Sequence, residues 1–237
     1  MEHELKKHLH NILKEAGNRK KNIWKRLGEI LVEILIIVFA VSFAVYMEKQ
    51  REHAHEEKEV KEFLIGLKTD LENDIKEMTG DIWGYSTCST WLKYFVKEQQ
   101  VNKDSLNKYT WVLISKTHLL PNKGRYEGFK ASGKMNTIQN HKLRNNILDL
   151  YEERIVGLTN ATKEYIELKG KMLQLLFAKR MGIGTKSDNL VMVLKDNELR
   201  NYLLALADVG EIIQRYQSAI KEVKGIVQII DEIYPEH

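Results

Sequence analysis

Two acidic side chains lie near the start of the most apolar stretch of the chain, residues 28–49. Glu29 and Glu33 are four residues apart, so a helix places both carboxylates on one face. That face continues through Ile36, Ala40 and Ala44. Ionisable groups within a bilayer are costly and usually face a protein interior or water rather than lipid. We therefore predict that these five residues line a cation pathway with an apolar constriction when several copies surround an axis.

The same residues allow a second interpretation. Glu29 can pair with Lys25 and Arg26 one turn earlier, and both glutamates can lie among the lipid headgroups. The segment would then anchor the protein without conducting ions. In either case, small residues four positions apart, such as Ala40 and Ala44, suit close helix packing.

A second cluster of chemically capable residues is the basic interval from Lys108 to Arg144, in which Glu127 is the single acid. Phosphates require cations and unstacked bases require ring faces, so basic residues interleaved with aromatics are typical of single-stranded nucleic acid binding. An anionic lipid surface has the same charge requirement. A third alternative is a solvated loop whose aromatic rings belong to the core. We predict that an anionic ligand such as an oligonucleotide or nucleotide is bound by Lys123, Arg125, Tyr126, Phe129, Lys130, Lys134, Lys142 and Arg144.

Motifs for catalysis or metal binding are missing from the sequence. It contains no HExxH, GxSxG or GxGxxG pattern, and Cys88 is its single cysteine. His53 and His55 are two residues apart, so on a helix they point in nearly opposite directions. We expect no enzyme activity, no catalytic residues, no cofactor and no metal site.

The apolar segment can position these residues in a membrane only if it is long enough to cross the bilayer. Its uncharged run, residues 34–47, is shorter than the roughly 20 residues that a single span needs. From Trp24 to Tyr46, however, a helix rises about 33 Å, with an interfacial aromatic residue at each end. We therefore predict a transmembrane helix over residues 22–47.

Composition predicts that the remaining elements are helical. The 237 residues are 43% hydrophobic and 30% charged, with two prolines, and regular alternation of apolar and polar residues is missing. The expected fold class is all-α, although the run TWVLIS at 110–115 is ambiguous between strand and helix. The predicted elements are an amphipathic helix over 1–18, a helical stalk over 48–80 and a helical soluble domain over 81–237. A shorter aromatic-rich helix is expected near 82–98.

Two periodic segments predict a coiled-coil-like hairpin of long antiparallel helices, 140–178 and 188–234. The second has apolar residues at alternating steps of three and four from Leu206 to Tyr234. Gly182 and Gly184 supply the turn between the helices. The apolar seam can close within one subunit or between subunits.

Several stretches resemble a family of small bacterial membrane proteins of uncharacterised function, found chiefly in Bacteroidota. The similar features are Gly28-Glu29-Ile30 at the entry to the span, a Leu-x-x-Asp-Leu pattern at 67–71 and a Tyr-to-Ser-Gly segment at 126–133. One departure is the sequence Tyr46-Met47-Glu48-Lys49, where relatives often continue into an amide- and Trp-containing stretch. The resemblance implies one membrane span followed by a helical domain, and it implies no activity.

We therefore expect a homo-oligomeric, single-pass protein of the bacterial inner membrane, with lipid and its own copies as partners. One hypothesis is a channel or pore whose soluble domain senses the anionic ligand, by analogy with bacterial defence effectors that depolarise the host membrane. The other is a membrane-tethered scaffold or adaptor whose seam recruits a protein partner. More basic residues precede the span than follow it, which favours a cytoplasmic N-terminus. Nucleic acid sensing instead requires a cytoplasmic domain, and labelling of Cys88 from each side would distinguish the two.

Overall fold

The computed structural model describes residues 2–97, 102–186 and 188–235, with side chains from Leu27 onward and that of Lys25. All regular secondary structure in these ranges is helical, which confirms the all-α prediction. The run TWVLIS forms a short helix followed by an extended segment without strand pairing. The helices are α1 Glu2–Lys97, α2 Lys103–Tyr109, α3 Trp111–Ile114, α4 Gly124–Ala131, the 3-10 helix η1 Lys134–Thr137, α5 His141–Asp149, the π-helix η2 Leu150–Arg154, α6 Ile155–Lys179, α7 Leu190–Val193, α8 Asn197–Ala207 and α9 Gly210–Ile233.

The predicted N-terminal elements are not separate helices. The amphipathic segment 1–18, the span 22–47, the stalk 48–80 and the aromatic segment near 82–98 fall within the single helix α1, apart from the ends outside its bounds. The expected stop at Gly17-Asn18 is wrong because glycine costs only about 1 kcal/mol in a helix and the first proline is Pro121. The chain divides inside α1 into two units, residues 1–58 and 59–237.

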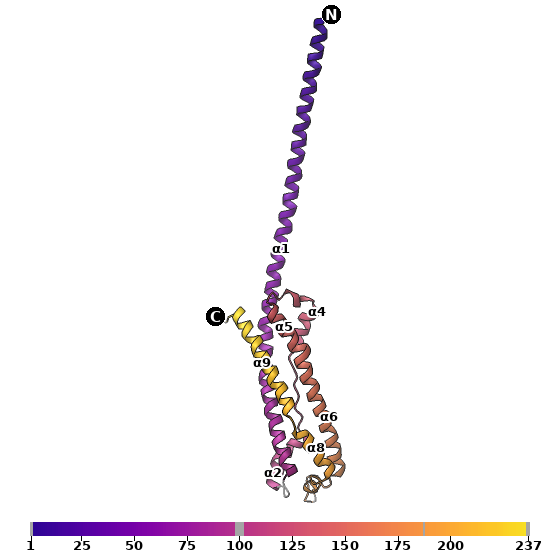
Figure 1. The fold of residues 1–237 in the computed structure, drawn as a ribbon, viewed down its shortest axis with the longest axis vertical. Helices are drawn as coiled ribbons and strands as arrows, with labels where there is room; N and C mark the ends of the chain where they lie inside the picture. The colour runs from indigo at the N-terminus through magenta and orange to yellow at the C-terminus, as the bar shows by residue number, and fades with distance from the viewer. Residues whose placement is uncertain (1, 98–101, 187, 236–237) are drawn as a thin grey trace. The chain divides into compact units, whose positions relative to one another are not determined.

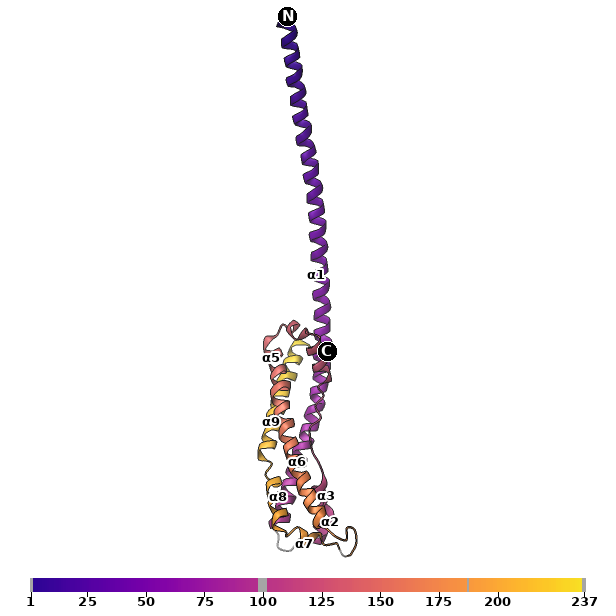
Figure 2. The ribbon, with the colours of Figure 1, turned by 90° about the vertical axis from the view of Figure 1, so that its right-hand side faces the viewer.

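The second unit, which we call the body, has its own hydrophobic core. On α1 this core begins at Val60, whereas residues 48–58 are exposed. The predicted stalk over 48–80 is therefore exposed in its first part and belongs to the body from there on. Within the body, the C-terminal part of α1 packs against α9 and α6 (Figures 1 and 2).

Contacts across the body define the direction of α9. Lys68 Nζ lies 2.6 Å from Asp231 Oδ1, and Tyr216 donates a hydrogen bond to Asp81 over 2.7 Å. The earlier residue of α1, Lys68, contacts the later residue of α9, and the later residue of α1, Asp81, contacts the earlier one. The two helices are therefore antiparallel. An extended segment, residues 115–123, returns along α1 before the chain enters α4.

The first half of the predicted hairpin agrees with the structure, and the second half does not. α5, η2 and α6 follow one another without interruption from His141 to Lys179, close to the predicted 140–178. The predicted helix 188–234 is instead three helices, α7, α8 and α9. Asp196 begins α8 as an N-cap that accepts a hydrogen bond from the Leu199 amide, and Ser89 donates to the carbonyl of Ala207 where α8 ends. These side chains satisfy backbone groups that helix breaks expose.

The apolar seam closes within the chain. Buried residues on α6 include Leu158, Tyr165 and Met172, and those on α9 include Tyr216 and Val223. The stripe predicted from Leu206 to Tyr234 by steps of three and four is too narrow. Ile213, Ile220 and Val227, which follow that spacing, are partly buried, whereas Ile212, Ala219 and Ile226, one residue before each of them, are buried.

Candidate functional site

The apolar segment of α1 is the first candidate site. Within the described residues, α1 provides the one stretch long and apolar enough to cross a membrane, with a mean hydropathy of 2.7 and no buried residue in that window. Its largest side chains are exposed, including Leu35 at 64% and Phe39 at 72%. A helix that exposes this much apolar surface requires lipid or another protein surface around it.

The predicted pore residues share one face of this segment. Glu29, Glu33, Ile36, Ala40 and Ala44 follow one another at steps of three or four and are all exposed. The alternative ion pair between Lys25 and Glu29 does not form, whereas the side chain of Arg26, the other predicted partner, lies outside the described residues. Among the described side chains, neither Glu29 nor Glu33 has an ion-pair partner, and both carboxylates lie beside an apolar helix face.

The second predicted site, the basic interval, lies in the body. Four of its cations are paired with acids in the structure: Lys123 with Glu127 at 2.9 Å, Arg125 with Asp70 at 2.9 Å, Lys130 with Glu152 at 2.5 Å and Lys134 with Glu59 at 2.7 Å. Asp70 and Glu59 belong to α1, so two of these pairs hold the segment that carries α4 and η1 against α1. Much of the positive charge seen in the sequence is thus balanced in space.

The two aromatic rings of this predicted site belong to the core or its margin. Tyr126 is only 3% exposed, stacks on Tyr151 with ring centroids 4.3 Å apart and donates a hydrogen bond to Glu152 over 2.6 Å. Phe129 is partly buried and stacks on Phe63 at 3.9 Å. Stacking of a nucleobase on Tyr126 is therefore incompatible with this packing, which corrects the expectation for that residue.

Burial and hydrogen bonds shift the pKa values of Tyr126 and Glu152. Burial raises the pKa of Tyr126, and its hydrogen bond to Glu152 raises it further. Hydrogen bonds from Lys130 and Tyr126 lower the pKa of Glu152. Two predicted cations remain outside such pairs among the described residues: Lys142 is exposed, and Arg144 is partly buried.

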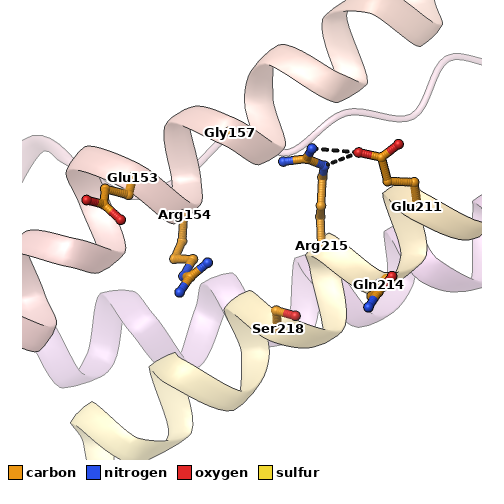
Figure 3. Close-up of a pocket in the computed structure, with 7 residues that line it drawn as sticks. All are labelled: Glu153, Arg154, Gly157, Glu211, Gln214, Arg215 and Ser218. Carbon is orange, nitrogen blue, oxygen red and sulfur yellow. Dashed lines mark hydrogen bonds and ion pairs between the residues drawn. The ribbon is translucent and has the colours of Figure 1, made fainter.

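A groove between η2–α6 and α9 was not predicted. Its lining residues are Glu153, Arg154, Gly157, Glu211, Gln214, Arg215 and Ser218 (Figure 3), and the groove is open to solvent on one side. In Figure 3, Arg154 extends toward α9, and Arg215 extends from α9 toward α6. A Cβ on Gly157 would lie 3.4 Å from Arg215 Nη1, an ordinary van der Waals contact, so the guanidinium lies directly against this part of α6.

The charges of this groove are also balanced locally. Arg215 donates to Glu211 over 2.6 Å, and Arg154 donates to Glu222 over 3.0 Å. A ligand carboxylate or phosphate could bind here only in competition with these glutamates. The groove could not be predicted from the sequence. Arg154 and Arg215 lie in two separate helical segments, and only the tertiary fold brings them close.

The core contains a buried cation that sequence analysis missed. Lys169 is 1% exposed, and its Nζ donates to the carbonyl of Val112 over 2.8 Å. The hydroxyl of Tyr165, one turn earlier, is buried without a hydrogen-bond partner among the described residues. Lys169 lies in register with the apolar residues Leu158, Tyr165 and Met172, and that position on the stripe was the available signal.

The last candidate is a metal site, which the sequence does not predict. In the part of the chain that is described, no group of three or more His, Cys, Asp or Glu side chains could hold a metal ion. No family model, curated protein or solved structure matches the chain.

Proposed function

We propose that the protein is a single-pass membrane protein whose copies assemble through the apolar segment of α1 into a cation-conducting channel. The observation that carries this proposal is that Glu29 and Glu33, which have no ion-pair partner among the described side chains, lie on the face that continues through Ile36, Ala40 and Ala44. In lipid, these carboxylates favour an arrangement in which they face one another or water rather than hydrocarbon. Two rings of carboxylates followed by a narrow apolar and alanine-lined stretch would attract cations and provide a hydrophobic gate.

The body is proposed to control the channel by sensing an anionic ligand. Lys123, Arg125, Lys130 and Lys134 are occupied by carboxylates, so a phosphate-bearing ligand must displace acids to bind there. Displacing Asp70 from Arg125 and Glu59 from Lys134 would release the α4–η1 segment from α1. Ligand binding would thereby change a contact of the helix that also carries the membrane segment, and Lys142 and Arg144 would add cations.

Ion flux through proteoliposomes tests the channel. The full chain should pass monovalent cations, and Glu29→Gln combined with Glu33→Gln should reduce the preference for cations over anions, because it removes both carboxylate rings. Glu48→Gln with Glu52→Gln is the matched control, because it also removes two carboxylates, spaced four apart on α1, but beyond the apolar segment. Impermeable liposomes containing oligomers of every size would exclude a channel.

The alternative is a membrane-tethered scaffold or adaptor. Its original basis, recruitment through the hairpin seam, is weakened because those apolar residues are buried within the chain. A scaffold would have to use the outer surface of the body. Impermeable liposomes together with stable oligomers would favour this alternative.

A further inference from the structure

The end of the body that carries the α6–α7 connection exposes apolar side chains. We call Phe177, Met181, Ile183 and Met192 the apolar tip; their exposed fractions are 50%, 67%, 56% and 68%. Backbone hydrogen bonds bring part of the tip together, because Asn189 donates to Met181 and accepts from Met192. Figure 2 shows α7 at the same end of the body as α2 and α3.

Hydrogen bonds tie the described residues on either side of the tip loop together. Arg180 donates two hydrogen bonds to Asp188, at 2.6 and 3.0 Å, and this pairing holds the pKa of Asp188 at about 2. The side chain of Asn189 accepts from the Met181 amide and donates to the Lys179 carbonyl. Gly182 and Gly184 adopt positive φ angles of 65° and 76°, which let the backbone turn between the apolar residues. A partner therefore meets preorganised apolar side chains and loses little free energy in ordering them.

The charges around the tip are cationic once local pairs are taken into account. Arg180 neutralises Asp188, and Lys179 neutralises Asp196 at 2.6 Å, which leaves the charge of Glu198, 3.8 Å from Lys179, to be set against the two lysines that follow. Lys186 and Lys195 are exposed and have no ion-pair partner among the described residues. Apolar side chains bordered by uncompensated lysines fit the boundary between headgroups and acyl chains of an anionic bilayer.

The apolar tip lies far from Glu59, the first residue of the body. Glu59 and Lys97 are separated by about 57 Å along α1 at 1.5 Å per residue, and the tip lies at the Lys97 end (Figures 1 and 2). This surface is therefore separate from the Glu59 end, where α1 and the η1 segment are joined by an ion pair.

We propose that the apolar tip is a bilayer-docking surface that inserts Met181 and Ile183 among anionic lipid headgroups. Lys186 and Lys195 supply the attraction to the headgroups, and the neighbouring Phe177 and Met192 extend the apolar contact. This function is independent of ion conduction, because it involves neither the membrane segment of α1 nor the basic interval.

Capture of acceptor vesicles by the full chain tests the proposal. The protein is placed in nanodiscs of uncharged lipid, so that its own apolar segment is already surrounded by lipid and cannot capture vesicles. Vesicles containing phosphatidylglycerol should bind these nanodiscs, and phosphatidylcholine vesicles should bind them much less. Met181→Ser combined with Ile183→Ser should weaken capture about tenfold, which corresponds to about 1.4 kcal/mol.

A matched control uses an exposed apolar residue elsewhere on the body. Leu204 is 50% exposed on α8, so Leu204→Ser should leave capture unchanged. Unchanged helicity of the double variant by circular dichroism verifies that its body remains folded. Absence of capture, equal capture of both vesicle types or equal capture by the double variant would each overturn the proposal.

Discussion

Lys169 Nζ donates a hydrogen bond to the backbone carbonyl of Val112 across 2.8 Å, inside a core where the lysine side chain is 1% exposed. This contact joins α6 to α3. Burial lowers the pKa of Lys169, because the charged amine loses its hydration without a carboxylate beside it. The core therefore contains a group that opposes folding when it is charged.

Replacing this amine by an apolar side chain of similar length should stabilise the body. Lys169→Met removes the cost of burying the amine and keeps most of the packing, so we expect the free energy of unfolding to rise by about 1–2 kcal/mol at pH 7. The measurement is urea unfolding followed by circular dichroism. Lys171→Met, at an exposed position on the same helix, is the control and should change the free energy of unfolding little. A destabilised Lys169→Met variant would mean that the hydrogen bond to Val112 outweighs the burial cost.

The effect of Lys169 should depend on pH with a defined sign. Because its pKa is lower in the folded state than the unfolded value of about 10.5, the unfolded state binds more protons between these two values. The wild-type protein should gain stability as pH rises through this window, and Lys169→Met should lack that contribution. The stability advantage of the variant should therefore shrink from pH 7 to pH 10, and an advantage that is constant across this range would contradict the assignment.

Asp74 should hold the extended segment 115–123 along α1. Its carboxylate is 1% exposed and accepts hydrogen bonds from the backbone and side-chain amides of Asn122 at 3.0 and 2.7 Å. Asp74→Ala leaves both donors without this acceptor, so we expect a loss of about 2 kcal/mol in the free energy of unfolding.

Asp74→Asn is the matched variant, because it keeps an acceptor oxygen and removes the charge. Burial raises the pKa of Asp74 in the folded state above its ordinary value of 3.8. The wild-type protein should therefore lose stability as pH rises through the folded-state pKa, because the buried carboxyl becomes charged. The asparagine variant should therefore retain most of the wild-type stability at pH 7. Its deficit relative to wild type should increase toward pH 4, where the wild-type carboxyl becomes protonated. Equal losses for alanine and asparagine would show that the hydrogen bonds are not responsible.

The ion pairs of the basic interval should compete with an anionic ligand. Glu59→Gln combined with Glu152→Gln frees Lys134 and Lys130, so binding of a short single-stranded DNA should strengthen about two- to fivefold, as expected for losing exposed ion pairs. Fluorescence anisotropy at low salt measures this affinity, which should fall steeply as salt rises. Glu72→Gln combined with Glu232→Gln, at exposed positions on α1 and α9, controls for the change in net charge. Absence of DNA binding by both proteins at low salt would remove the ligand proposal.

The topology experiment must be redesigned because Cys88 is buried. Its thiol is 3% exposed, so maleimide should label it only after denaturation, and labelling from either side of a membrane would be uninformative. Lys93→Cys in a Cys88→Ala background places a thiol at an exposed position of the same helix. This thiol should react with an impermeant reagent from one side only. Rapid labelling of native Cys88 would contradict the buried environment.

Local patterns in the sequence were sufficient for the helical class, the apolar segment and the long α5–α6 run. Helix formation depends on neighbouring residues and on apolar spacing, so a nearly proline-free chain with three- and four-residue periodicity specifies these features locally. The breaks around Lys195 and Asp208 were missed because the apolar spacing continues through them. They depend on caps and on a distant partner, Ser89, which contacts Ala207 only in the folded body.

Only the tertiary structure determined the state of the charged residues. The sequence shows that Arg125, Lys130 and Lys134 are basic and close in order, but their partners Asp70, Glu152 and Glu59 come from segments far away in the chain. Coulombic interactions depend on distance in space, so the balance of charge cannot be read from sequence order. For Glu29 and Glu33 the reverse holds, because helical spacing alone places both carboxylates on one face of the apolar segment.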